Sequence, residues 1–255
     1  MVDVLDGKWE PLGANAKVLV TKEHRFNTDT ILLANFSAPK HKEVCADFGT
    51  GCGTIPLIWA ARNKPKKIIG VELQEKAYLQ AKESVNQCGF EIDLINDNIK
   101  NYKQLFRSQC LDLVACNPPY KAVGRGLKNL DENKKIARHE EELTMEELAK
   151  AAAFSLKFGG RLCVCQRPER LSDAMNIFAK HGLEPKILRL VQGHRNKAPS
   201  LFLLECRRGG NMGLKILPTL IIEENGDFTQ EMMEIYGDYK QGNFLVKDNI
   251  QNNEE

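Results

Sequence analysis

Several features are missing from this sequence of 255 residues, and each absence excludes a class of protein. No apolar run approaches the ~20 residues that a membrane-spanning helix needs, so we expect no membrane contact. The N-terminus, MVDVLDGKWEPLG, is acidic and mixed, which argues against a signal peptide. The formal net charge is only +2, so a nucleic-acid partner has to be argued from local basic patches. The expectation is a cytoplasmic protein.

Paired metal-binding cysteines are also missing. The eight cysteines are scattered, with no Cys-x-x-Cys pair. Nothing resembles a zinc site, so no metal is expected, and His139 and His194 are as readily structural as functional. We interpret the cysteines as reduced thiols in strands and helices. Cys163 and Cys165 alternate along one predicted strand, and we expect them to face opposite sides of the sheet.

Apolar runs alternate with helical patterns from about Glu43 to Cys206. This alternation predicts an α/β fold, with a mostly parallel sheet covered by helices on both faces. The last two predicted strands, PKILRLVQ and SLFLLECRR, are joined by a short polar loop and must form a hairpin. The predicted strands before them are EVCADFG, KKIIGVE, EIDLIND, LDLVACN and RLCVCQ.

The predicted helices lie between these strands. TIPLIWAARN, QEKAYLQAKESVNQCG and RLSDAMNIFAKHG carry helical patterns. TMEELAKAAAFSLKFGG begins with a capping box of Thr144 and Glu147, and we expect that helix to close on Gly159 and Gly160. The expected organisation is a small hairpin and a helix from near Thr28 in residues 1–42, an α/β domain in 43–208, and an appendage with a polar tail in 209–255.

The segment DFGTGCG follows the first core strand and precedes a helix. Its glycines, Gly49, Gly51 and Gly53, allow a sharp turn and let a ligand approach bare backbone. The spacing is not the dinucleotide G-x-G-x-x-G, and no G-K-[ST] is present, so we expect a nucleoside ligand without pyrophosphate. Glu72 lies ~20 residues further on, at the end of the next strand, where an acid accepts hydrogen bonds from both ribose hydroxyls.

The third strand ends at INDNI, on the border of the same crevice. Asp97 could accept a hydrogen bond from an exocyclic adenine amine, and the backbone N–H of Asn98 or Ile99 could meet a ring nitrogen. The alternative is that Asp97 only caps a turn, which Asp and Asn favour in any case.

The fourth strand runs directly into the sequence NPPY, residues 117–120. The side-chain oxygen of Asn117 and the carbonyl of Pro118 are two acceptors whose geometry the prolines restrict, and Tyr120 offers a flat face. Such a site suits a planar –NH₂ group: adenine N6, cytosine N4 or a glutamine amide. Acceptors on both N–H bonds stabilise the positive charge that develops as this nitrogen attacks a methyl sulfonium. We therefore expect Asn117, Pro118 and Tyr120 to be catalytic.

These motifs together resemble a known family. DFGTGCG followed by NPPY resembles the S-adenosylmethionine-dependent amino-methyltransferases of class I, whose Rossmann-like sheet has seven strands, mostly parallel, with one of them antiparallel. Further segments are similar to the bacterial tRNA1(Val) (adenine37-N6)-methyltransferase family, and the resemblance covers nearly the whole chain. It implies methyl transfer from S-adenosylmethionine to N6 of an adenine in tRNA, at position 37 beside the anticodon. These segments are FNTDTILLANF, ARHE, GGRLCVCQRPERLSDAM, LEPKILRLVQ and GLKILPTLIIEENGDFTQEM.

The resemblance also implies a role for FNTDT. In the family this segment lies over the methionine end of the cofactor, where Asp29 can pair with the ammonium and Phe26 packs nearby. Asp47, at the first strand end, could also meet the ammonium, directly or through water. The expected cofactor-binding residues are Phe26, Thr28, Asp29, Asp47, Gly49, Gly51, Gly53, Glu72, Leu73, Asp97, Asn98 and Asn117.

A basic segment, YKAVGRGLKNLDENKKIARHE, follows the catalytic motif. We expect it to act as a lid that orders on RNA phosphates; the alternative is a solvated loop. RPER and GHRNKAP add basic residues that could rim the same face. The expected RNA-binding residues are Lys121, Arg125, Lys128, Lys134, Lys135, Arg138, Arg167, Arg170, Arg195 and Lys197.

Three alternatives compete with tRNA methylation. A glutamine methyltransferase of release factors has the same four-residue motif, but its family usually carries a larger helical domain before the glycine turn, and only 46 residues precede Asp47. A DNA adenine methyltransferase generally adds a target-recognition domain, for which the residues after Arg208 look too few. A cofactor-binding module without catalysis would have no need of NPPY. The particular tRNA and the oligomeric state stay open.

Overall fold

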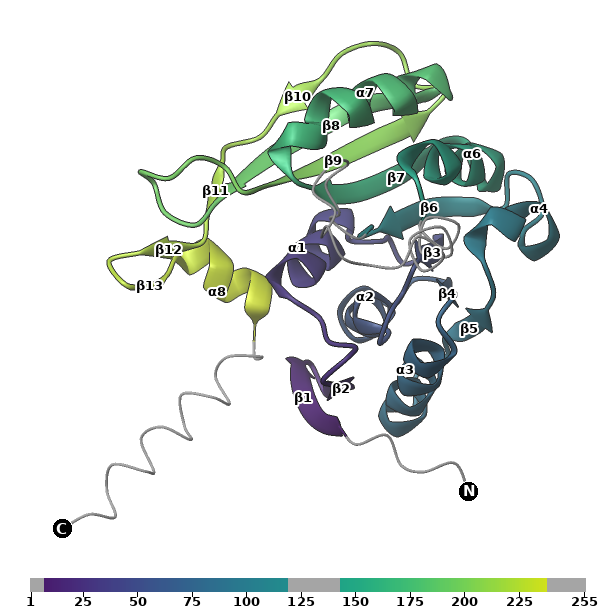
Figure 1. The fold of residues 1–255 in the computed structure, drawn as a ribbon, viewed down its shortest axis with the longest axis vertical. Helices are drawn as coiled ribbons and strands as arrows, with labels where there is room; N and C mark the ends of the chain where they lie inside the picture. The colour runs from purple at the N-terminus through teal and green to yellow at the C-terminus, as the bar shows by residue number, and fades with distance from the viewer. Residues whose placement is uncertain (1–6, 119–142, 238–255) are drawn as a thin grey trace, which may run out of the picture.

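A central sheet with helices on both faces dominates the computed structural model, which describes residues 7–118 and 143–237 (Figure 1). The strand order is β10-β8-β9-β7-β6-β3-β4-β5, and β11 also pairs with β8. The strands are β3 (Val44–Phe48), β4 (Lys67–Glu72), β5 (Asp93–Asn96), β6 (Leu111–Cys116), β7 (Leu156–Gln166), β8 (Leu183–Gln192), β9 (Leu201–Arg208), β10 (Lys215–Ile216) and β11 (Leu220–Ile221).

The expected α/β class and its seven main strands, β3 to β9, are confirmed. The strand pairs β5/β4, β4/β3, β3/β6 and β6/β7 are all parallel. Strand β9 runs antiparallel between β7 and β8, so the expected hairpin of the last two main strands is confirmed as well. The short strands β10 and β11 extend the sheet in parallel with β8, which the sequence did not indicate.

The sheet divides the core into two apolar layers, and helices cover each layer. One layer takes residues from α1, α2, α3 and α8, and the other takes residues from α6 and α7. No described helix is long and apolar enough to cross a membrane. The helices are α1 (Thr28–Ser37), α2 (Thr54–Ile58) with a π-helical continuation (Trp59–Asn63), α3 (Glu75–Cys88), α4 (Tyr102–Leu105), α6 (Met145–Ser155), α7 (Leu171–Lys180) and α8 (Gln230–Tyr236).

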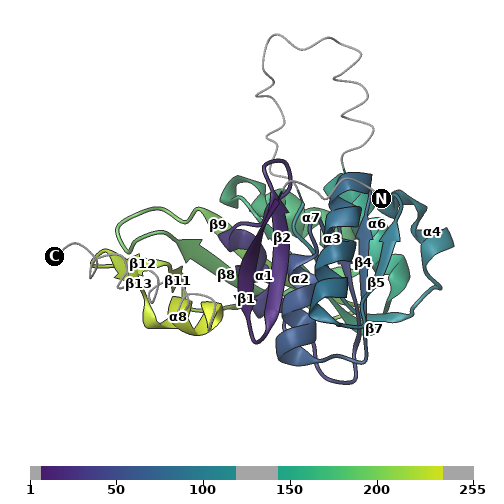
Figure 2. The same cartoon turned by 90° about the horizontal axis from the view of Figure 1, so that it is seen from below.

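Segments from both ends of the chain pack near the first helices. The hairpin of β1 (Gly7–Gly13) and β2 (Ala16–Thr21) lies against α3, where the Leu19 N–H donates to Ser84 Oγ at 3.0 Å (Figure 2). A second small hairpin, β12 (Glu223–Glu224) with β13 (Asp227–Phe228), leads into α8 beside α1 (Figure 1). Arg62 joins the two ends by donating to the carbonyls of Leu12 and Tyr236.

The helix that begins at Thr144 is shorter than the sequence predicted. Its capping box with Glu147 is present, but the helix ends at Ser155 and β7 begins at Leu156. The expectation that it closes on Gly159 and Gly160 is therefore wrong. Leu156 pairs with Leu111 of β6 and is fully buried, and the register then shifts so that Arg161 pairs with Leu113. Pairing with β6 overrides the local helical pattern, and both glycines lie inside the strand.

The expectation for Cys163 and Cys165 is also wrong. Both side chains belong to the same apolar layer, because residues two apart on a strand face the same side of the sheet. All eight cysteines are free thiols, as expected for a reduced protein. On this face the Cys165 thiol contacts Asn117, the residue that follows β6.

Candidate functional site

The glycine turn after β3 has the backbone that its sequence predicts. Gly49, Gly51 and Gly53 all have positive φ, at 78°, 56° and 85°. Residues with a side chain rarely adopt this backbone conformation. A Cβ on Gly51 would meet nothing within 4 Å, so this turn faces open space. A Cβ on Gly53 would instead lie 3.2 Å from the Cβ of Ala81. Gly51 therefore leaves room for a ligand, and Gly53 lets α2 approach α3.

Glu72 is fixed against this turn. Its carboxylate accepts hydrogen bonds from the Gly51 N–H at 2.7 Å and the Gln74 N–H at 2.8 Å, and the residue is buried. Two backbone donors hold the carboxylate at the end of β4, and each oxygen keeps further lone pairs for a ligand. The structure thus brings Glu72 and Gly51 together at the carboxyl end of the sheet, where a nucleoside ribose was expected.

Asp47 lies near the end of β3 and is only 1% exposed. Its Oδ1 has no hydrogen-bond partner among the described residues, which is uncommon for a buried carboxylate. Burial raises the pKa of Asp47 to about 7, the nearby Thr50 side chain opposes the rise, and the negative charge of Glu72 adds to it. A buried carboxylate in this state suits a cationic ligand group such as an ammonium.

This raised pKa predicts a pH-dependent stability. Between its ordinary value of 3.8 and about 7, the folded protein keeps a proton on Asp47 that the unfolded chain has lost. The free energy of unfolding should therefore fall as the pH rises through this range and level off above it, a change on the order of 4 kcal/mol. Urea unfolding of the ligand-free protein at pH 5 and pH 8 should show about 3 kcal/mol of this change, because part of it occurs below pH 5.

Asp47→Asn should remove this part of the pH dependence, since an amide does not titrate. The matched control is Asp227→Asn, because Asp227 is exposed and its substitution should leave the dependence intact. An unchanged difference between pH 5 and pH 8 in Asp47→Asn would contradict the assignment.

The adenine end of the expected site is built from β5 and the turn after it. The backbone N–H of Asp97 donates to the Glu72 carbonyl at 3.1 Å, which ties this turn to β4. Asp97 Oδ1 accepts from the Asn98 N–H and from Asn101 Nδ2, and Asn98 Oδ1 accepts from the Lys100 N–H. The turn-capping alternative is thus present in the structure. It does not use Asp97 Oδ2, so a role in adenine binding stays a prediction.

Leu73 offers an apolar side chain beside this turn. It directly follows Glu72 and is 39% exposed, one of few large apolar side chains so exposed in the described part of the chain. An exposed leucine next to the expected ribose site suits contact with the face of a base.

Asn117 lies at the end of β6 between two elements that come from distant parts of the chain. Its Nδ2 donates to Thr30 Oγ1 of α1 at 3.1 Å, and its Oδ1 accepts from the Cys165 thiol of β7 at 3.1 Å. Asn117 is partly buried and Pro118 is buried, while Pro119 and Tyr120 lie outside the described residues. The expected catalytic amide therefore has a defined orientation.

Helix α1 starts beside this amide. Asn27 caps the helix, with Oδ1 accepting from both the backbone N–H and the hydroxyl of Thr30 at 3.1 Å. Thr28 shares a hydrogen bond of 3.0 Å with the Tyr236 hydroxyl of α8, and the partly buried Phe26 packs against the core. Asp29 lies in the first turn and is partly exposed. The structure brings the FNTDT segment to the expected catalytic residue.

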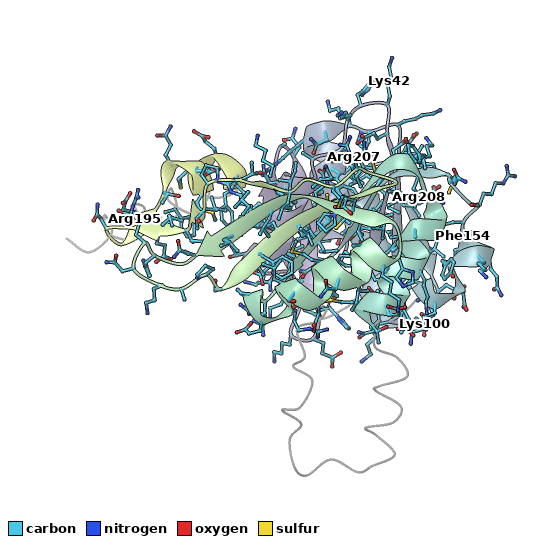
Figure 3. The ribbon with its side chains drawn as sticks, turned by 90° about the horizontal axis from the view of Figure 1, so that it is seen from above. Lys42, Lys100, Phe154, Arg195, Arg207 and Arg208 are labelled. Atoms are coloured by element: carbon cyan, nitrogen blue, oxygen red, sulfur yellow. The ribbon has the colours of Figure 1, made fainter. Side chains whose placement is uncertain are left out.

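Three of the four described basic residues proposed for RNA have side-chain partners on the protein. Arg167 donates to the Ser200 carbonyl and Arg170 to Asp173. Arg195 pairs with Glu224, whereas Lys197 is exposed. Figure 3 shows Arg195 at the opposite end of the molecule from Lys100, which follows the Asp97 turn. The other expected contacts lie outside the described residues: Lys121, Arg125, Lys128, Lys134, Lys135 and Arg138.

Comparison with known proteins shows the family of the chain. A family model described as the methyltransferase small domain matches residues 23–181. The chain belongs to this family. The methyltransferase is 28% identical over 219 residues to a "tRNA1(Val) (adenine(37)-N6)-methyltransferase" of Photorhabdus laumondii, covering 84% of this chain and 88% of the relative. It is 30% identical to the protein of that name from Tolumonas auensis, covering 71% and 75% respectively.

A solved structure supports the fold of the methyltransferase. A protein from Agrobacterium tumefaciens, described as a predicted O-methyltransferase, superimposes with a TM-score of 0.66 at 18% identity, covering 82% of this chain and 95% of that one. The resemblance stated from the motifs is confirmed, and the methyl donor is S-adenosylmethionine. The open turn at Gly51, the fixed carboxylate of Glu72 and the unpaired Asp47 Oδ1 fit a nucleoside with an attached ammonium.

Sequence reasoning missed four residues of this site. Asn27 and Thr30 lie within the recognised FNTDT segment, so the motif gave a signal for them that was not used. Cys165 and Tyr236 gave none, because their contacts with Asn117 and Thr28 join residues that are 48 and 208 positions apart.

Proposed function

We propose that this methyltransferase transfers a methyl group from S-adenosylmethionine to N6 of an adenine in tRNA, at position 37 beside the anticodon. The observation that carries the proposal is the placement of Asn117. Strand β6 ends next to β3, with Ala115 paired to Asp47, so Asn117 follows at the edge of the sheet that also carries the glycine turn. The amide oxygen that would hold the substrate amine thus lies beside the expected methionine end of the cofactor.

The relatives support tRNA as the substrate. Proteins named for adenine 37 of tRNA1(Val) align with the chain over most of their length. An anticodon loop presents unpaired bases, which lowers the cost of moving adenine into a pocket. We propose tRNA as the partner, with no membrane or metal involved, and a cytoplasmic location. The oligomeric state is left open.

The mechanism divides three tasks among the chain's own residues. Glu72 would accept hydrogen bonds from the ribose hydroxyls, and Asp47 and Asp29 would face the ammonium. When bound, S-adenosylmethionine supplies a methyl group activated by a sulfonium. Asn117 Oδ1 and the Pro118 carbonyl would accept hydrogen bonds from the two N6–H groups. These bonds would stabilise the positive charge that develops on the nitrogen. The proton can then leave to water, so no general base is required.

We propose the same three regions that the sequence suggested. Residues 43–208 would form the methyltransferase domain, with 1–42 covering the cofactor and 209–255 as an appendage. The bond between Thr28 and Tyr236 supports a role for the appendage in holding the start of α1 in place. The residues that would contact RNA phosphates are Lys121, Arg125, Lys128, Lys134, Lys135, Arg138, Arg167, Arg170, Arg195 and Lys197.

A labelling experiment tests the proposal. The purified protein should transfer labelled methyl from S-adenosylmethionine to an unmodified tRNA1(Val) transcript, and nucleoside mass spectrometry should identify N6-methyladenosine. A matched transcript with guanine at position 37 should stay unlabelled. Labelling of a release factor or of DNA, with the tRNA left unlabelled, would overturn the proposal.

A further inference from the structure

Three side chains form a hydrogen-bonded relay from the start of α1 to the end of β6. Asn27 Oδ1 caps the helix, Thr30 Oγ1 lies 3.1 Å from it, and Asn117 Nδ2 lies 3.1 Å from Thr30 Oγ1. Thr30 and Asn117 are 87 positions apart in the sequence. Neither Asn27 nor Thr30 is among the residues expected to touch cofactor or substrate.

The donor and acceptor roles in this relay follow from its first member. A backbone N–H can only donate, so the Thr30 N–H requires Asn27 to present its carbonyl oxygen. The Thr30 hydroxyl lies within hydrogen-bonding distance of the same oxygen and must also donate to it, because Oδ1 carries no hydrogen. A hydroxyl has a single hydrogen, so its oxygen is left as the acceptor for Asn117. Asn117 must therefore turn its NH₂ group towards Thr30.

The opposite branch of the amide is then its carbonyl oxygen. Cys165 donates its thiol hydrogen to Asn117 Oδ1, a contact that favours the same orientation from the β7 side. A carbonyl oxygen has two lone pairs, so it can accept a substrate N–H in addition to the thiol. A flipped amide would present NH₂ hydrogens to a substrate amine that also carries hydrogens, and two donors repel.

We propose that Asn27 and Thr30 are positioning residues that fix the orientation of the Asn117 amide, so that the cap of α1 determines which atom meets the substrate amine. This inference rests on the proposed function, since it concerns the asparagine that would hold that amine. It adds a role for two residues that need not touch either substrate. Removing the Thr30 hydroxyl would remove the acceptor that holds the Asn117 NH₂ group, and so lower the cost of a flipped amide, without changing the cofactor site.

Thr30→Val and Thr30→Ser form the test pair. Valine has nearly the same shape without the hydroxyl, and serine keeps the hydroxyl. In Thr30→Val, kcat for tRNA should fall by about tenfold to a hundredfold, while KM for tRNA and Kd for S-adenosylmethionine stay within about twofold. Thr30→Ser should keep kcat within about threefold of wild type. Asn27→Asp, which keeps the cap acceptor, should likewise retain more kcat than Asn27→Ala.

Methyl transfer by wild type, measured first, separates this inference from the proposed function. Without transfer to tRNA by wild type, the proposed function fails and the inference falls with it. With an active wild type, an unchanged kcat in Thr30→Val would overturn the relay alone. The relay would also be overturned if Thr30→Ser lost as much kcat as Thr30→Val. A kcat loss accompanied by weaker cofactor binding and a lower Tm would show a merely structural role.

Discussion

Asn117→Ala should abolish methyl transfer to tRNA, a loss of at least about a thousandfold in kcat, while leaving the affinity for S-adenosylmethionine within about threefold. The reason is that its amide oxygen accepts a hydrogen bond that strengthens as positive charge develops on the attacking nitrogen. Alanine offers no acceptor, and the Pro118 carbonyl alone cannot hold both N–H bonds. An interaction that matters mainly in the transition state lowers kcat rather than substrate binding.

Single-turnover kinetics and calorimetry measure the two quantities. The matched control is Asn86→Ala, because Asn86 lies on the exposed face of α3. A loss of cofactor affinity as large as the loss of kcat would show that Asn117 belongs to the cofactor site and not to the reacting amine. Transfer that survives the substitution would remove Asn117 from the mechanism.

Local backbone chemistry explains which parts of this site could be read from the sequence. A glycine turn between a strand and a helix needs positive φ, and Gly49 and Gly51 have it. Helix α3 ends at Cys88, and its capping residue Gly89, the last letter of the helical segment read from the sequence, also has positive φ. Glu72 was placed correctly beside the turn because strand ends in a parallel sheet converge at one edge. The glycine features depend on residues that are close in sequence, and the position of Glu72 follows from one strand–helix–strand connection.

The features that could not be predicted depend on contacts between distant segments. The Asn117 contacts come from α1 and β7, and they follow from the strand order β7-β6-β3 and not from any local pattern. The unpaired oxygen of Asp47 could not be foreseen either, because only the assembled structure shows which donors are absent. Helix α6 shows the opposite error. The helical pattern of the sequence continues past Ser155, but the residues from Leu156 form a strand that pairs with β6.

Glu72→Ala should have the opposite kinetic effect from Asn117→Ala. Glu72 lies at the expected ribose, away from the reacting atoms, so its hydrogen bonds would contribute equally before and in the transition state. Losing them should weaken S-adenosylmethionine binding by at least about a hundredfold, since two hydrogen bonds to a charged acceptor contribute about 1.5–3 kcal/mol each. At saturating cofactor, kcat should recover to within about threefold of wild type, because uniform binding affects KM alone.

Two companion variants sharpen this expectation. Glu72→Gln keeps one acceptor oxygen, but its NH₂ group must face one of the backbone donors, the Gly51 N–H or the Gln74 N–H. Its affinity for the cofactor should therefore lie between those of wild type and Glu72→Ala. Glu75→Ala, an exposed acid in the first turn of α3, should bind as wild type does. If Glu72→Ala kept its affinity while kcat collapsed, the carboxylate would act at the reacting centre, and the division of labour between Glu72 and Asn117 would be wrong.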